Sequence, residues 1–313
     1  MRVLVAEPLG QAGIDRLRIE HQVDVKTGLA RADFLAALPD YEALIVRSGI
    51  KVDAAAISAG ARLKVVGRAG VGVDNIDVPA ATAAGIAVVN APTANTLAAA
   101  EHTLALILAL ARNVAAADVS VRHGEWRRAD FMGSELSGKT LGIIGLGRVG
   151  IAVADRARAF EMNLVGNDPI ISFAVADAHG VRLVELDPLL EQADVVTLHV
   201  PLVAATRGLI DAGRLALMKP GALLVNVARG GIVDEAALAD ALVGDRLGGA
   251  AVDVFEQEPL RESPLLSAPR TVLTPHLGAS TAEAQDRASL EVVEGVLDVL
   301  AGRSAIFQVN RPN

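Results

Sequence analysis

The chain has 313 residues, of which 52% are hydrophobic and 21% charged, enough for two compact units that each bury a core. Its formal net charge of −8 argues against a nucleic-acid partner, because neutralised phosphates supply much of the affinity for nucleic acids. It contains no cysteine, which excludes disulfides, thiol nucleophiles and cysteine-ligated metal sites.

The first part of the chain alternates short apolar runs with helical stretches. We expect strands at Val3–Ala6, Ala43–Val46, Val65–Val66 and Ala87–Val89, and a helix at about Ala12–Glu20. This β–α–β alternation predicts a parallel sheet covered by helices on both faces.

An Ala- and Leu-rich segment, Asn95–Asn113, follows and is long enough to cross from one unit to another. Its most apolar part, Thr103–Ala111, is far shorter than the roughly 20 residues that span a bilayer, so we expect a buried helix and no membrane partner. No signal-peptide core fits the N-terminus, where Glu7 and Pro8 interrupt the first apolar run. These features predict a cytoplasmic protein.

The second series of apolar runs is stronger than the first. We expect strands at Thr140–Ile144, Asn163–Val165, Val195–Leu198, Leu223–Val225, Gly249–Val252 and Thr271–Leu273, and a final helix at about Ala282–Ala301. The same alternation again predicts a parallel sheet.

A glycine-rich turn follows the first strand of this second series. Gly145, Gly147 and Gly150 form G-x-G-x-x-G ahead of a helix expected at Ile151–Phe160. In a dinucleotide site the first glycine permits a tight turn, the second lets the backbone approach a pyrophosphate, and the third allows close helix–strand packing. By itself the pattern also occurs in ordinary glycine-rich turns, so its context decides.

That context is an acid at the end of the next strand. Asp168 follows Gly150 by 18 residues, the position of the carboxylate that binds an adenosine ribose; the alternative is a solvated turn carboxylate before Pro169. A carboxylate here repels the extra phosphate of NADP by roughly 4 kcal/mol per pair of unit charges at ~4 Å, before salt screening. We therefore expect NAD as the cofactor.

A second phosphate-loop pattern, at Gly133–Thr140, is misleading. It satisfies G-x-x-x-x-G-K-[ST], which functions only after a strand and at the start of a helix. Here the pattern precedes a strand. We interpret it as a loop that leads into the sheet.

Charged groups gather at three expected strand ends. The segment after Leu223–Val225 carries Arg229, the segment after Gly249–Val252 carries Asp253 and Glu258, and His276 follows the last strand. Doubly wound sheets bind ligands at their carboxyl ends, so a base, an acid and a guanidinium there form a candidate catalytic constellation. No H-E-x-x-H or G-x-S-x-G motif is present, and we expect no metal site.

With these residues in view, the chain resembles the D-isomer-specific 2-hydroxyacid dehydrogenase family over almost its whole length. The motifs that carry the resemblance are Val65–Asp77, Gly145–Gly150, Asn226–Glu235, Ala250–Pro259 and Thr274–Ser280, in the family's order. The resemblance implies an NAD-dependent enzyme that acts on a small anionic 2-hydroxy or 2-keto acid.

The resemblance also implies a role for each catalytic residue. His276 would take the proton of the substrate hydroxyl while hydride leaves for nicotinamide, and an imidazole suits such a base. Glu258 would hold and stabilise the imidazolium. Arg229 would bind the substrate carboxylate and polarise the developing carbonyl.

The same resemblance implies the binding residues. The backbone of Gly70, Val71 and Gly72 would form a nest for the substrate carboxylate, with Asn95 close to the substrate. Asp253 would contact the nicotinamide, and Arg148 and Val149 would contact the pyrophosphate beside the three motif glycines.

Within the family, Arg47 and Ser48 most resemble the members that oxidise D-3-phosphoglycerate to 3-phosphohydroxypyruvate, the reaction that opens serine biosynthesis. They would bind the phosphate, and Arg127 or Arg128 would reach in from a partner subunit. The alternatives are a structural ion pair for Arg47 and solvated charges for the Arg127–Arg128 pair. Ile50 departs from this pattern, since a polar residue is expected there.

The implied fold has two doubly wound parallel-sheet lobes, a Rossmann dinucleotide-binding domain at 93–282 inserted in a flavodoxin-like substrate domain at 1–92 and 283–313. Closure of the cleft would exclude water during hydride transfer. A homodimer or homotetramer is expected. Two other functions stay open: a glyoxylate, hydroxypyruvate or D-lactate reductase of the same family, and an NAD-sensing regulatory scaffold.

Overall fold

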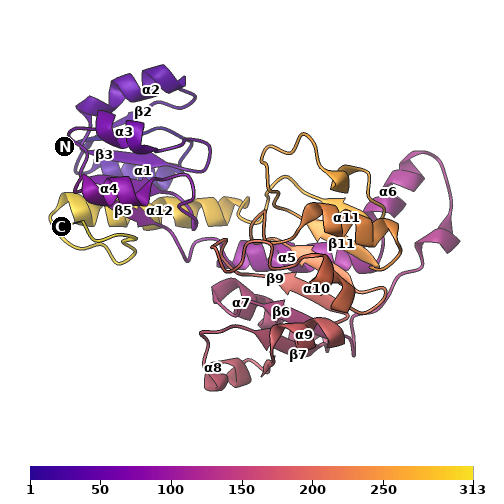
Figure 1. Cartoon of the computed structure of the whole chain (residues 1–313). Helices are drawn as coiled ribbons and strands as arrows, with labels where there is room; N and C mark the ends of the chain where they lie inside the picture. Colours follow the sequence, from indigo (N-terminus) through magenta and orange to yellow (C-terminus); the bar gives the residue numbers. More distant parts are fainter. Residues whose placement is uncertain (313) are drawn as a thin grey trace. The chain divides into compact units, whose positions relative to one another are not determined.

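The computed structural model describes residues 1–312 and divides the chain into two compact units. Unit 1 comprises Met1–Asn95 and the chain from Ala279 onward, and unit 2 comprises Thr96–Gly278. The expected boundaries were close to residues 93 and 282. Each unit is built on its own parallel sheet (Figure 1).

Unit 1 contains a five-stranded sheet in the order β2-β1-β3-β4-β5, with every neighbouring pair parallel. Its strands are β1 (Arg2–Val5), β2 (Gln22–Val25), β3 (Ala43–Val46), β4 (Val65–Arg68) and β5 (Ala87–Asn90), and its helices are α1 (Gln11–Arg18), α2 (Arg31–Ala37), α3 (Ala54–Ala59), α4 (Val78–Ala83) and α12 (Ala282–Leu300). Because α1 and α12 pack together and share one core cluster while Phe34 and Ile57 belong to another, helices cover both faces. This strand order is flavodoxin-like.

Unit 2 contains a seven-stranded parallel sheet in the order β12-β11-β10-β9-β6-β7-β8. Its strands are β6 (Thr140–Ile144), β7 (Asn163–Asn167), β8 (Arg182–Leu183), β9 (Val195–Leu198), β10 (Leu223–Asn226), β11 (Gly249–Val252) and β12 (Thr271–Leu273). Its helices are α5 (Thr96–Ala111), α6 (Val114–Arg122), α7 (Arg148–Ala157), α8 (Phe173–Ala178), α9 (Leu186–Gln192), α10 (Ala212–Leu217) and α11 (Glu235–Val243). The order reverses between β6 and β9, which defines the crevice where such sheets bind ligands.

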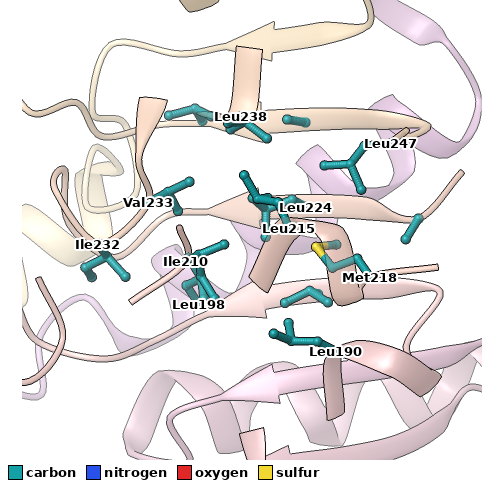
Figure 2. Packing of buried hydrophobic residues seen from close by; sticks show 14 of the residues in the cluster. Leu190, Leu198, Ile210, Leu215, Met218, Leu224, Ile232, Val233, Leu238 and Leu247 are labelled. Atoms are coloured by element: carbon teal, nitrogen blue, oxygen red, sulfur yellow. The ribbon is translucent and has the colours of Figure 1, made fainter. Parts of the chain in front are cut away.

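The core of unit 2 is aliphatic and lies on both faces of the sheet. On one face, Leu198 and Leu224 of adjacent strands pack against Leu190, Leu215 and other side chains from α9, α10 and α11 (Figure 2). On the other face, α5 and α7 cover a second cluster that includes Ile107. Truncating one such leucine to alanine costs about 2–5 kcal/mol, so these layers hold the strand ends in place.

The fold class predicted from the sequence is confirmed. The observed elements differ from the predicted ones at the edges of the two sheets and at the ends of helices. The strands β2 and β8 were not predicted, because both are sheet-edge strands with polar residues and no continuous apolar run. The expected segment Asn95–Asn113 is α5 followed by a break at Asn113, where φ is +54°. The helix after the glycine turn begins at Arg148, three residues earlier than expected.

Two interpretations of apolar and glycine-rich segments agree with the structure. Most of α5 is buried in the core of unit 2. No single helix in residues 1–312 is long and apolar enough to cross a membrane, and α5 and α6 reach that limit only as a pair bent by 63°. The segment 133–139 is a loop that leads into β6, as predicted. The nucleoside-triphosphate pattern is therefore followed by a strand and not by the helix that a phosphate-binding loop requires.

Candidate active site

The candidate site of unit 2 lies where the parallel strands end. The carboxyl ends of β6, β7, β10, β11 and β12 are followed respectively by Gly145–Gly150, Asp168, Arg229, Asp253 and His276. Parallel strands present these ends at one edge of the sheet, so the fold gathers residues that lie up to 131 positions apart (276 − 145).

Each of the three motif glycines is a glycine for a different structural reason. Gly145 adopts φ +92°, and a Cβ there would lie 2.6 Å from the carbonyl oxygen of His199. A Cβ at Gly150 would lie 2.0 Å from the carbonyl oxygen of Gly145, which keeps α7 close to β6. Gly147 faces open space at the start of α7, where N–H groups and the helix dipole favour an anion.

Asp168 is tied directly to this loop. Its Oδ2 accepts the Leu146 N–H at 2.8 Å, and its Oδ1 accepts the N–H groups of Ile170 at 2.8 Å and Ile171 at 3.1 Å. Partial burial opposes its ionisation, but the three backbone donors outweigh that cost and hold the pKa of Asp168 below its usual value. Asp168 is therefore a preorganised anion beside the glycine turn, a feature that the spacing alone did not reveal.

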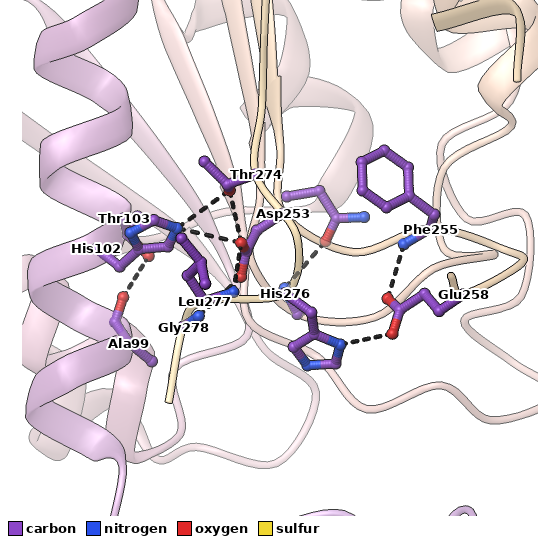
Figure 3. A network of polar contacts seen from close by, with 12 residues as sticks. Ala99, His102, Thr103, Asp253, Phe255, Glu258, Thr274, His276, Leu277 and Gly278 are labelled. Atoms are coloured by element: carbon purple, nitrogen blue, oxygen red, sulfur yellow. Dashed lines mark hydrogen bonds and ion pairs between the residues drawn. The ribbon is translucent and has the colours of Figure 1, made fainter. Parts of the chain in front are cut away.

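His276 and Glu258, which the family resemblance implies to be a base and its supporting carboxylate, are in contact. His276 Nδ1 lies 2.7 Å from Glu258 Oε2, and Glu258 Oε1 accepts the Phe255 N–H at 3.0 Å (Figure 3). Burial opposes the charge on Glu258, yet the bonds from His276 and Phe255 bring its pKa below the usual value. With Nδ1–H donated to the carboxylate, Nε2 of His276 is left as the proton acceptor.

Asp253 holds the segment that carries His276. Its side chain is fully buried, and its carboxylate accepts the Thr274 hydroxyl at 2.6 Å and the N–H groups of Leu277 at 2.7 Å and Gly278 at 2.9 Å (Figure 3). Its main-chain carbonyl accepts the N–H of His276 at 2.8 Å. Asp253 thus supports His276, which stands in the left-handed region at φ +55°.

His102 completes this network and was not singled out from the sequence. Its Nε2, on α5, lies 3.2 Å from both Asp253 Oδ1 and Thr274 Oγ1. Burial opposes the charge on Asp253, and the donors from His102, Thr274 and the backbone lower its pKa overall. A histidine inside an apolar helix carries no sequence signal for this contact, because its partner is 151 residues away.

Arg229 lies on a turn shaped by Asn226. The Asn226 side chain accepts the Ala228 N–H at 3.0 Å and donates to the Arg229 carbonyl at 2.9 Å. A Cβ at Gly230 would lie 1.9 Å from the Phe255 carbonyl oxygen, so this glycine lets the Arg229 turn pack against the segment that leads to Glu258. Arg229 itself is partly buried.

Unit 1 carries the residues predicted to bind substrate. Within residues 1–312 the N–H groups of Val71 and Gly72 have no acceptor, whereas the Val71 carbonyl accepts from Asn90 and the Gly70 carbonyl from the Ala91 N–H. The two N–H groups are therefore free to bind an anion, while the neighbouring carbonyl groups already have hydrogen-bond donors. A backbone nest for a carboxylate requires this arrangement. Asn95 ends the first segment of the unit.

Unit 1 carries two arginines near the ends of neighbouring strands β3 and β4, Arg47 and Arg68. Arg47 follows β3 and is partly buried, and its guanidinium makes no hydrogen bond or ion pair within the described chain. Arg68, which was not predicted as a site residue, ends β4, and its guanidinium lies so close to Gly70 that a Cβ at Gly70 would clash with it.

Arg127 is paired with Asp130 at 2.6 Å in an exposed position, as the solvated-charge alternative describes. Among residues 1–312, no group of three or more histidine, aspartate or glutamate side chains could hold a metal ion.

A parallel seven-stranded sheet with a glycine turn after β6 and an acid after β7 defines a dinucleotide-binding dehydrogenase fold. The model of the family described as "D-isomer specific 2-hydroxyacid dehydrogenase, NAD binding domain" matches residues 104–278. The chain therefore belongs to the D-isomer specific 2-hydroxyacid dehydrogenase family and carries its NAD-binding domain.

Relatives and solved structures agree with this membership. The chain is 51% identical over 99% of its length to a D-3-phosphoglycerate dehydrogenase of Synechocystis sp., but it covers 56% of that protein. It thus spans little more than half the length of this curated relative. The TT0316 protein of Thermus thermophilus matches with a TM-score of 0.92 and 39% identity, covering 99% of this chain and 100% of that one. A glyoxylate reductase from Paecilomyes thermophila matches with a TM-score of 0.89 and 34% identity, covering 99% and 98%.

Proposed function

We propose that the chain is an NAD-dependent dehydrogenase that oxidises D-3-phosphoglycerate to 3-phosphohydroxypyruvate. The observation that carries this proposal is the His276–Glu258 pair at 2.7 Å, at the same sheet edge as the glycine turn, in a chain about half identical to a D-3-phosphoglycerate dehydrogenase. A regulatory scaffold would not need this acid–base pair.

The residues present fit NAD. The open space at Gly147, the first turn of α7 with Arg148 and Val149, and the preorganised carboxylate of Asp168 match a pyrophosphate and a ribose diol. NAD, when bound, supplies the acceptor for the hydride that leaves the substrate carbon. In our proposal Asp253 does not contact the nicotinamide directly, because its buried carboxylate already accepts hydrogen bonds from Thr274, Leu277 and Gly278.

The chain's own groups handle the proton and the substrate charge. Nε2 of His276 takes the hydroxyl proton as the carbon loses hydride, and Glu258 stabilises the imidazolium that results. Arg229 binds the substrate carboxylate and polarises the new carbonyl. The free N–H groups of Val71 and Gly72 bind a carboxylate oxygen, Asn95 contacts the substrate, and Arg47 with Ser48 binds the phosphate.

A family reductase acting on unphosphorylated acids is the second candidate, favoured by the similarity to a glyoxylate reductase. NADH oxidation with 3-phosphohydroxypyruvate, hydroxypyruvate and glyoxylate at equal concentration separates the two. A strong preference for the phosphorylated acid supports our proposal. Equal or better turnover of the unphosphorylated acids would move the function to a general 2-keto-acid reductase.

We also propose a homo-oligomer, a homodimer or homotetramer, in the cytoplasm. The support is an apolar surface on and after α6: Val114, Val119, Val121, Trp126 and Met132 are each more than half exposed, Trp126 by 85% and Met132 by 87%. Large apolar side chains exposed on one short stretch of a chain are typical of a protein interface. Light scattering after size-exclusion chromatography measures the mass; a monomer at micromolar concentration would contradict this proposal.

A further inference from the structure

The loop that follows β3 in unit 1 is organised around the carboxylate of Glu7. Glu7 lies two residues beyond the end of β1, which pairs with β3. Its Oε2 accepts the N–H groups of Arg47 at 2.6 Å and Ile50 at 3.3 Å, and its Oε1 accepts the N–H of Gly49 at 3.0 Å. One side chain therefore binds three of the four N–H groups of the loop 47–50.

The carbonyl side of the same loop is held by Asn75. Its Nδ2 donates to the carbonyl oxygens of Arg47 and Ile50, both at 2.7 Å. A Cβ at Gly49 would lie 2.8 Å from Glu7 Oε1, so the glycine provides the room that the carboxylate occupies. Glu7 and Asn75 together fix the loop from inside unit 1.

This arrangement leaves few groups of the loop for a ligand. An open turn of four N–H groups could bind a phosphate through its backbone, as anion nests do. Here a resident carboxylate takes three of them, and within residues 1–312 only the Ser48 N–H has no acceptor. What the loop still offers an incoming anion is the Ser48 N–H and hydroxyl and the unpaired guanidinium of Arg47.

We propose that Glu7 is a positioning residue that determines specificity for the phosphorylated substrate, by fixing the loop 47–50 so that Arg47 and Ser48 present their donors to the phosphate. This inference rests on the proposed function, since it concerns the same substrate. Glu7 itself does not touch the substrate. Its charge satisfies the loop's own N–H groups, so the phosphate is recognised by a guanidinium, whose planar fork matches phosphate oxygens.

The chemistry of the contact requires a carboxylate. Both oxygens of Glu7 accept hydrogen bonds from N–H donors. A glutamine has one carbonyl oxygen, and its NH2 group would face at least one loop N–H, donor against donor. The substitution Glu7→Gln therefore keeps the volume but releases part of the loop.

The test compares a phosphorylated with an unphosphorylated substrate in the full chain. We expect Glu7→Gln to raise the KM for 3-phosphohydroxypyruvate about tenfold, the loss of about one good contact, while the KM for hydroxypyruvate and both kcat values change less than about twofold. Gly49→Ala disturbs the same contact from the loop, since its methyl group would displace the Glu7 carboxylate. It should also raise the ratio of the KM for 3-phosphohydroxypyruvate to the KM for hydroxypyruvate.

Asp53→Asn is the matched control. Asp53 is also a carboxylate of unit 1 that accepts a backbone N–H, from Ala56 at 3.0 Å, but it caps α3 and does not contact the loop 47–50. Its variant should lose some thermal stability without changing the ratio of the two KM values. An equal change of the ratio in Asp53→Asn would overturn the proposal, because the effect would then be general.

Arg47→Met separates failure of this inference from failure of the proposed function. If the wild-type chain shows no preference for the phosphorylated acid, both are overturned. If the wild-type chain shows the preference and Arg47→Met leaves it intact, the proposed function stands and only this inference is overturned. If Arg47→Met abolishes the preference but Glu7→Gln and Gly49→Ala, folded by circular dichroism, leave it unchanged, only the role of Glu7 is overturned.

Discussion

Asp253 in unit 2 and Glu7 in unit 1 have similar positions but different surroundings. Each carboxylate closely follows a strand and accepts N–H groups from the segment after a neighbouring strand. Asp253 is fully buried and also binds the side chains of Thr274 and His102, whereas Glu7 is partly exposed and binds backbone alone. The buried carboxylate supports the segment that carries His276, and the partly exposed one shapes the loop 47–50.

The difference indicates how each unit tolerates change. An acceptor that is buried and bound by four donors cannot be replaced by water, so its loss exposes the whole segment 274–278 to rearrangement. Water can partly replace a carboxylate at the surface, so the expected effect there is confined to one ligand contact. Under the proposed function, we therefore expect substitutions at the buried carboxylate to affect turnover and substitutions at Glu7 to affect selectivity.

The largest effect is expected at His276. His276→Ala should lower kcat by about 10²–10⁴-fold, because the proton acceptor is lost, while NAD binding measured by fluorescence titration persists. His123→Ala provides a control, since that histidine is exposed on the surface and bonds only to the backbone at Val119. Unchanged turnover in His276→Ala would remove the acid–base pair from the mechanism, and turnover could then no longer be assigned to unit 2.

Asp253→Asn tests the buried anchor. Its NH2 group would face N–H donors of Leu277 or Gly278, and we expect the free energy of unfolding at pH 7 to fall by about 3 kcal/mol, with a lower kcat. Because the pKa of Asp253 is lowered by folding, the ionised carboxylate stabilises the fold above its ordinary pKa near 4 and loses this effect as pH falls through the lowered pKa.

Urea titrations from pH 7 down to pH 3 measure the difference in the free energy of unfolding between the wild type and Asp253→Asn. The gap between wild type and Asp253→Asn should be constant above about pH 4 and narrow below it. A gap that widens on acidification would contradict the assignment of an ionised Asp253.

Asp168→Ala should reduce the preference for NAD over NADP about tenfold or more, because the repulsion of the extra phosphate is removed. The ratio of kcat/KM for the two cofactors measures it. Asp168 also anchors Leu146, so a part of the loss should appear in the KM for NAD itself. If the ratio does not move, the ribose is bound elsewhere.

A smaller effect is expected at His102. His102→Leu removes one of the donors to Asp253 and should lower kcat about fivefold to tenfold, while His102→Gln, whose amide keeps a donor, should retain most of it. The unfolding midpoint of each variant distinguishes a loss of position from a loss of fold. Equal kcat values for the leucine and glutamine variants would show that the hydrogen bond has no role.

The fold class could be predicted from the order of the amino acids, and so could the positions of the candidate site residues at the strand ends. Short aliphatic runs at β-α-β spacing predict parallel sheets, and the glycine turn, Asp168, Arg229, Glu258 and His276 follow such runs because ligand groups lie at strand ends. The strands β2 and β8 escaped prediction, since a polar edge strand is stabilised by its neighbour and has no apolar signal of its own.

The residues that support the chemistry became visible only in the folded chain. The contacts of His102 with Asp253, of Asp168 with Leu146 and of Glu7 with the loop 47–50 join residues 151, 22 and 40–43 positions apart. A hydrogen bond needs its partner within about 3 Å, and spacing along the chain carries no information about such a distance once the segments lie on different strands. The candidate site residues leave a pattern in the sequence because they follow strands, whereas the residues that hold them are identified by their contacts in three dimensions.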